Sequence, residues 1–123
     1  MEGGQTNEFR PLILVAEDDD SNFKLIKAII GKKCDIQWAK NGEEIVALFK
    51  EYGKEAKAIL MDIKMPVMNG LDATKIIREE NKEIPIIMQT AYAFSSDKEN
   101  AMNAGASEVL VKPITLSILR GTL

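Results

Sequence analysis

Five side chains that could do chemistry each follow a short apolar stretch of this 123-residue sequence. They are two neighbouring acids, a third acid, a hydroxyl and an ammonium group: Glu17, Asp18, Asp62, Thr90 and Lys112. A short apolar run bounded by turn residues is typical of a strand buried on both faces. Because ligands of open parallel sheets bind at the carboxyl ends of the strands, we expect these five groups to gather at one edge of a sheet.

The charges of these side chains favour a divalent cation. The three carboxylates contribute −3 and Lys112 contributes +1, so the expected pocket carries a net charge of −2. Crowded carboxylates raise one another's pKa unless a cation offsets them. The sequence has no His and a single Cys. The ligands would therefore be oxygen atoms, which favours Mg²⁺ or Mn²⁺ over zinc.

Asp62 is the candidate nucleophile because it ends the run predicted to be the central strand. An Asp carboxylate can attack phosphorus and form an aspartyl-phosphate. Glu17 and Asp18 would hold the metal, while the metal, Lys112 and Thr90 would each contact the phosphoryl oxygens and neutralise their charge. Taken singly, each acid that follows a strand is more often a helix cap or a solvated turn residue. The prediction therefore rests on the joint placement of the groups.

Strand and helix patterns alternate along the chain and would position these groups. The predicted strands are 12–16, 35–39, 58–62, 85–90 and 109–111. Residues 35–39 alternate between apolar and polar, which is typical of a half-exposed edge strand. Five strands alternating with helices predict a three-layer α/β/α sandwich with a mostly parallel sheet.

The helices between these strands are predicted from apolar spacing and capping residues. Asp20 or Ser21 would cap the first, and its buried stripe would be Leu25, Ile26, Ile29 and Ile30. The next would follow the turn at 41–42, and the third would begin near Leu71 and carry Ile76 and Ile77 inward. The fourth would run from a capping box at 96–99 to Gly105, and a short last helix would follow Thr115.

Composition indicates one soluble domain: 46% of the residues are hydrophobic, 28% are charged, and the net charge is −3. This balance gives no general attraction to nucleic acid or to an anionic membrane. No apolar run approaches the roughly 20 residues of a membrane span, and no signal-peptide pattern opens the chain. We therefore expect a cytoplasmic protein. Residues 1–10 are predicted to be a flexible tail, and residues 11–123 the domain.

From about Leu12 to Pro113 the sequence resembles the receiver domain of a two-component response regulator. The matching segments are 13–22 with an acidic pair, 59–70 with a phosphoryl-accepting Asp, 89–93 with a switch hydroxyl and 104–113 with a buried lysine. Segment 59–70 is the most specific match. The Glu17-Asp18 pair and the loop with Tyr92 and Ala93 also look like those of receivers appended to hybrid sensor histidine kinases.

The resemblance implies a flavodoxin-like fold with strand order 2-1-3-4-5. It also implies Mg²⁺-dependent phosphorylation of Asp62 by the phospho-histidine of a partner, either a histidine kinase or a histidine phosphotransfer protein. The backbone carbonyl of Lys64 would be a further metal ligand. Such a domain is not an enzyme for other substrates, because it catalyses only its own phosphorylation and dephosphorylation. With its short last helix, it would form at most a weak homodimer.

The resemblance also implies a conformational switch in which Thr90 moves toward the phosphoryl group. Many family members carry Tyr or Phe at a second switch position, where this sequence has Val109. The change would therefore pass through the loop 91–95, which begins with Ala91 and Tyr92. A further hypothesis is that Lys64 and Tyr92 screen the acyl phosphate from water and lengthen its lifetime.

Two alternatives remain at this point. A haloacid-dehalogenase-like phosphatase also uses a strand-end Asp, Mg²⁺ and a lysine. It needs a second Asp two positions after the nucleophile, where this sequence has Lys64. A degenerate receiver that binds partners without phosphorylation is the other alternative, although every acceptor-site residue is present. Nucleotide binding has no support, since neither GxxxxGK nor GxGxxG follows the first strand.

Overall fold

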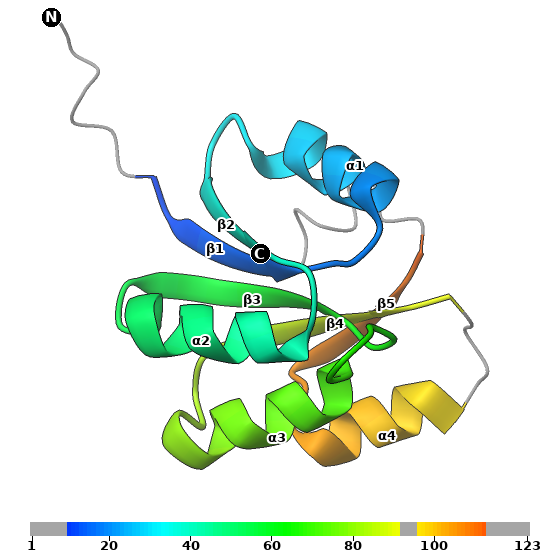
Figure 1. Cartoon of the computed structure of the whole chain (residues 1–123). Helices are drawn as coiled ribbons and strands as arrows, with labels where there is room; N and C mark the ends of the chain where they lie inside the picture. The colour runs from blue at the N-terminus through cyan, green and yellow to red at the C-terminus, as the bar shows by residue number, and fades with distance from the viewer. Residues whose placement is uncertain (1–9, 92–95, 113–123) are drawn as a thin grey trace, which may run out of the picture.

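Strands and helices alternate along the chain in the computed structural model, which describes residues 10–91 and 96–112 (Figure 1). The strands in these ranges are β1 (Leu12–Ala16), β2 (Asp35–Ala39), β3 (Ala56–Asp62), β4 (Ile86–Thr90) and β5 (Glu108–Val111). The helices are α1 (Asp20–Ile30), α2 (Gly42–Tyr52), α3 (Gly70–Glu80) and α4 (Ser96–Ala104). None of these helices has the length and apolar character that crossing a membrane would require.

The strands form one parallel sheet in the order β2-β1-β3-β4-β5, as predicted. The chain leaves β1 for β2 on one side and then returns to β3 on the other, so the direction of winding reverses between β1 and β3. Ala16 of β1 pairs with Met61 of β3. The residues that follow this pair, Glu17 and Asp62, therefore come level with each other at the point where such folds bind ligands.

Helices cover the sheet on both faces, with α1 on one face and α2, α3 and α4 on the other (Figure 1). Alternate residues of β1 belong to the two different cores. Ile13 and Val15 pack on the α1 side, and Leu14 and Ala16 pack on the opposite side. Because successive side chains of a strand point to opposite faces, a strand between two helical layers is apolar at every position. This explains the uninterrupted apolar runs in the sequence.

The start of α1 differs from the sequence prediction. Its N-cap is Asp19, whose side chain accepts a hydrogen bond of 3.0 Å from the backbone N–H of Ser21, so neither Asp20 nor Ser21 is the cap. Leu25 was expected in the buried stripe but is 38% exposed, and Phe23 is buried instead. The heptad spacing of Phe23, Ile26 and Ile30 is equally helical, and packing against the sheet decides which stripe faces inward.

Other element ends lie within two residues of their predicted positions. Asn41 caps α2, which confirms that residues 41–42 form a strand-to-helix turn and not a hairpin. Asn69 caps α3, which begins at Gly70, and Ile77 is buried while Ile76 is only partly so. Gly105 follows α4 with a φ of 117°, the conformation expected of a glycine that ends a helix. The predicted last helix lies outside the described residues.

Val67 has a strained backbone in the loop between β3 and α3. Its φ is 69°, and the N–H of Met68 donates to the carbonyl of Pro66 at 2.7 Å, which makes a γ-turn centred on a β-branched residue. The Val67 side chain is 74% exposed, so packing does not compensate for this strain.

We expect Val67→Gly to stabilise the protein, because glycine adopts a positive φ without steric conflict. Relief of about 1–2 kcal/mol of strain should outweigh the extra freedom of glycine in the unfolded chain, leaving a net gain of about 0.5–1 kcal/mol. Urea unfolding would measure the gain. Val67→Ala is the control, since it removes the exposed methyl groups but keeps Cβ. An equal gain in the two variants would show that strain is not the cause.

Candidate functional site

A pocket of about 230 Å³ lies where the carboxyl ends of the strands meet. Its lining comes from the β1–α1 turn, the ends of β3, β4 and β5, and the first turn of α4. The lining residues are Asp18, Asp62, Ile63, Lys64, Gln89, Thr90, Ala91, Asp97 and Lys112. Four of the five side chains that the sequence selected therefore line one pocket, and the fifth, Glu17, lies behind it.

Three acids form a cluster at this pocket. Oxygen atoms of Glu17, Asp18 and Asp62 all lie within 4.8 Å of one another. Their environments differ, because Glu17 is 0% exposed and Asp62 is 5% exposed, whereas Asp18 is at the surface. An oxygen-only cluster of this kind, with one face open to solvent, suits a hard divalent cation that keeps some of its water. The residues present therefore fit Mg²⁺.

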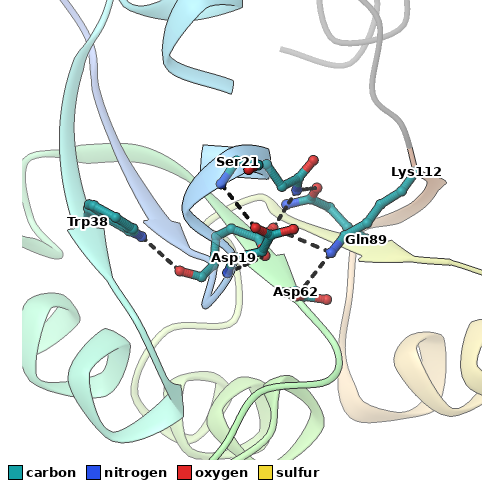
Figure 2. Close-up of polar contacts among 8 residues, drawn as sticks. Asp19, Ser21, Trp38, Asp62, Gln89 and Lys112 are labelled. Carbon is teal, nitrogen blue, oxygen red and sulfur yellow. Dashed lines mark hydrogen bonds and ion pairs between the residues drawn. The ribbon is translucent and has the colours of Figure 1, made fainter. Parts of the chain in front are cut away.

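Lys112 is the positive charge of the cluster. Its Nζ lies 3.0 Å from Asp62 Oδ2 and 3.5 Å from Glu17 Oε1 (Figure 2). The backbone directs it there, since the N–H of Lys112 donates to the carbonyl of Thr90 at 2.8 Å and extends the pairing of β5 with β4. One ammonium thus serves two buried carboxylates, which leaves a net negative charge in the pocket.

The pKa values follow from this crowding. Burial, and then repulsion by Glu17, raise the pKa of Asp62 to about 6 despite its contact with Lys112. Burial, and then repulsion by Asp62, raise the pKa of Asp18. Burial acts to lower the pKa of Lys112, but its contacts with Asp62 and Glu17 outweigh this effect and raise it. The cluster therefore resists carrying its full negative charge without a cation.

Glu17 is held from several sides. Its carboxylate accepts hydrogen bonds from the side-chain amide of Asn22 and from the backbone N–H of Asp19, the latter at 3.2 Å. Its backbone carbonyl accepts a bond of 2.8 Å from Trp38 Nε1 (Figure 2). The Trp38 ring stacks on Phe23 of α1. These bonds tie the β1–α1 turn to both β2 and α1 and so keep the acid in place.

Close packing of the chain holds the segment around Asp62. The N–H of Gly70 donates to the carbonyl of Ile63 at 2.8 Å. A Cβ at Gly70 would collide with the backbone carbonyl of Asp62. Only glycine lets the start of α3 approach the acid this closely, which is the physical reason for Gly70 at the end of the loop.

The remaining predicted residues have different environments. Thr90 is buried and Ala91 exposed, and both line the pocket, whereas Val109 is partly buried and packs on the core under α2, α3 and α4. Lys64 lies at the rim, with its Nζ 3.6 Å from Asp97 Oδ2 in α4. Tyr92 and the bond between Lys112 and Pro113 lie outside the described residues.

Sequence reasoning missed three residues at this site: Asn22, Gln89 and Asp97. Gln89 could have been noticed, because it is a polar residue inside an apolar strand, Ile86–Thr90. Asn22 and Asp97 carry no such signal, since polar residues are ordinary on the first turns of helices. Their roles depend on how α1 and α4 pack against the sheet.

An acid cluster, a lysine and a hydroxyl at the switch point of a parallel sheet can bind a cation and transfer a phosphoryl group to a carboxylate. The family model described as "Response regulator receiver domain" matches residues 13–123. The chain belongs to this family. It is therefore a receiver domain of two-component signalling, and the phosphatase alternative has no support.

Relatives of this receiver agree with the assignment. It is 41% identical, over 87% of its length, to hybrid signal transduction histidine kinase I of Dictyostelium discoideum, but it spans only 7% of that protein. A solved structure of similar fold is the receiver domain of the sensor histidine kinase PA1611 from Pseudomonas aeruginosa, which holds a magnesium ion in its active-site cleft. It is 31% identical to the present receiver, with a TM-score of 0.84. The match covers 92% of the present receiver and 93% of the Pseudomonas chain.

A third relative was crystallised with a partner. It is the receiver domain of a Saccharomyces cerevisiae response regulator in complex with a histidine phosphotransfer protein. The matched yeast chain is 30% identical to the present receiver, with a TM-score of 0.81. The match covers 90% of the present receiver and 84% of the yeast chain.

We expect Asp62→Asn to raise the thermal stability of the receiver at pH 7.5 in the absence of metal. The pKa of Asp62 is about 6 in the folded protein against an ordinary value of 3.8, so the folded state prefers protonated Asp62. This preference lowers the stability progressively between about pH 4 and about pH 6, and the full loss is present above about pH 6. Asn mimics the protonated form and should gain about 1–2 kcal/mol at pH 7.5. The gain should disappear near pH 4. Unfolding curves at both pH values would measure it, and a loss of stability at pH 7.5 would contradict this account.

Proposed function

We propose that this receiver accepts a phosphoryl group on Asp62 from the phospho-histidine of a partner protein. The observation that carries the proposal is the Lys112 ammonium 3.0 Å from the Asp62 carboxylate, inside a pocket that also contains the acid cluster. A carboxylate oxygen of Asp62 bonds to phosphorus while the phosphorus–nitrogen bond of the donor breaks. The bonding electron pair stays on the imidazole nitrogen.

Glu17, Asp18 and Asp62, with the backbone carbonyl of Lys64, would hold Mg²⁺, or Mn²⁺ in its place. When bound, the cation supplies charge neutralisation for the transferring phosphoryl oxygens. The receiver itself contributes Lys112, directly after β5, and Thr90, at the end of β4, which both line the pocket. This division of labour suits phosphoryl transfer, where positioning and charge stabilisation matter more than covalent help.

The conformational response is proposed to start at Thr90. Phosphorylation adds about −1.5 to −2 charges next to its hydroxyl, and the hydroxyl moves toward them. The loop that begins with Ala91 follows. Val109 packs on the core and has no ring to rotate, so it serves only as a packing contact in this scheme. The result is a shift between two existing conformations.

The phosphoryl donor would be a histidine kinase or a histidine phosphotransfer protein, in keeping with the kinase relatives and the co-crystallised pair. We also infer that the receiver belongs to a hybrid sensor kinase, which its similarity to the Dictyostelium protein favours. Its net charge of −3 argues against direct binding of nucleic acid. A cytoplasmic location and a weak homodimer stay predictions.

Incubation with acetyl phosphate and Mg²⁺ should add one phosphoryl group to the wild-type receiver and none to Asp62→Asn. Intact mass spectrometry would detect it, and removal of the metal by EDTA should abolish it. Asp72→Asn is a matched control, since Asp72 is an exposed acid in the first turn of α3. Phosphorylation of Asp62→Asn to the wild-type extent would exclude Asp62 as the acceptor.

Beryllofluoride with Mg²⁺ should shift the amide NMR signals of Ala91 and of the first turn of α4 in the wild-type receiver. In Thr90→Ala these shifts should be much smaller, because alanine has no hydroxyl that can hydrogen-bond to the beryllofluoride group. Signals close to Asp62 should still respond. Equal shifts of the Ala91 signal in both proteins would show that Thr90 does not transmit the change.

A further inference from the structure

A pair of amide side chains stands behind the acid cluster. Asn22, on the first turns of α1, donates from Nδ2 to Glu17 Oε1. The same Nδ2 lies 3.3 Å from Gln89 Oε1, which accepts a second hydrogen bond. Both hydrogens of one amide nitrogen are thus used, one by the acid and one by Gln89. Because an amide group is planar, the second bond fixes the direction of the first.

Gln89 is an unusual residue for its position. It is 0% exposed, it pairs with Asp62 in the register of β3 and β4, and its side chain shares a face of the sheet with that acid (Figure 2). Within residues 10–91 and 96–112 its Nε2 has no hydrogen-bond partner. A buried amide with an unpaired N–H is less favourable than an apolar side chain of the same size. Stability of the fold therefore does not explain Gln89.

Glu17 shows what the amide pair achieves. It is the one acid of the cluster with no exposed surface, and Asn22, the N–H of Asp19 and the ammonium of Lys112 surround its two oxygens. Lys112 also contacts Asp62, and Asp19 donates only from its backbone. Asn22 therefore gives Glu17 a neutral side-chain donor that no other acid of the cluster uses. Without it, the carboxylate could turn and the lysine would be drawn further toward Glu17.

We propose that Asn22 and Gln89 are positioning residues for the divalent cation: Gln89 orients the amide of Asn22, and Asn22 holds Glu17 in the direction that completes the acid cluster. The inference rests on the proposed function, since it takes the cluster to be the cation site. It assigns to two residues outside the acid cluster a share in metal affinity. Supporting bonds of this kind commonly change metal affinity by about 10-fold to 100-fold.

The test is titration of the unphosphorylated receiver with MgCl₂ by calorimetry, together with thermal unfolding without metal. Asn22→Ala should weaken Mg²⁺ binding about 10-fold. Gln89→Met should weaken it by a smaller factor and at the same time raise the melting temperature, because it removes the unpaired amide. Ser21→Ala, next to Asn22 on α1, is the matched control and should leave the affinity unchanged.

A double-mutant cycle separates positioning from a general loss of structure. If Asn22 acts through Glu17, Asn22→Ala should change Mg²⁺ affinity by less than about twofold in a Glu17→Gln background. The full loss in that background would overturn the proposal, as would wild-type affinity in Asn22→Ala. A Gln89→Met variant that loses both stability and affinity would also overturn it, since Gln89 would then be a structural residue.

The same titration distinguishes this inference from the proposed function. A wild-type receiver that does not bind Mg²⁺ would overturn both. The other outcome concerns a wild-type receiver that binds Mg²⁺ and is phosphorylated on Asp62. If the Asn22 and Gln89 variants then bind Mg²⁺ with unchanged affinity, only the positioning role is overturned.

Discussion

Three carboxylates, two of them buried, and one ammonium group crowd together at one edge of the sheet, and this crowding governs the whole site. Burial and mutual repulsion make full ionisation of the acids unfavourable, so the pKa of Asp62 rises to about 6 although Lys112 is in contact with it. A fold selected for stability alone would avoid such a cluster. A divalent cation would offset this negative charge, in keeping with the proposed phosphoryl transfer to Asp62.

The fold keeps the cluster together by distributing the task among separate elements. A charged residue ends β3 and directly follows β1 and β5, and the parallel pairing of the sheet brings these strand ends to one level. Trp38 and Asn22 hold the turn that carries Glu17, and Gly70 lets α3 close on Asp62. The acids differ in burial, with Glu17 enclosed and Asp18 at the surface. The proposed cation would therefore enter from the exposed side, at Asp18.

Features that depend on residues close together in the chain could be predicted from the sequence. Apolar runs of buried strands, the Asn-Gly turns and Gly105 all follow from local sterics, and they placed each strand within two residues. The edges of the helical stripes were less predictable. Leu25 and Phe23 both satisfy helical spacing, and only the fit of α1 against the sheet decides that Phe23 is buried. The cap of α1 was misplaced because four acids and a serine in succession offer several equivalent caps.

The sequence by itself determined the alternation of strands and helices and the residue types at the strand ends, because burial on two faces and turn chemistry leave direct marks on the order of residues. Only the tertiary structure decided that Asn22 and Gln89, 67 positions apart, meet behind Glu17. A hydrogen bond between distant side chains depends on how a helix packs over a sheet, and local propensity carries no information about it. The strand-end acids were visible from the sequence, but their supporting bonds required the three-dimensional structure.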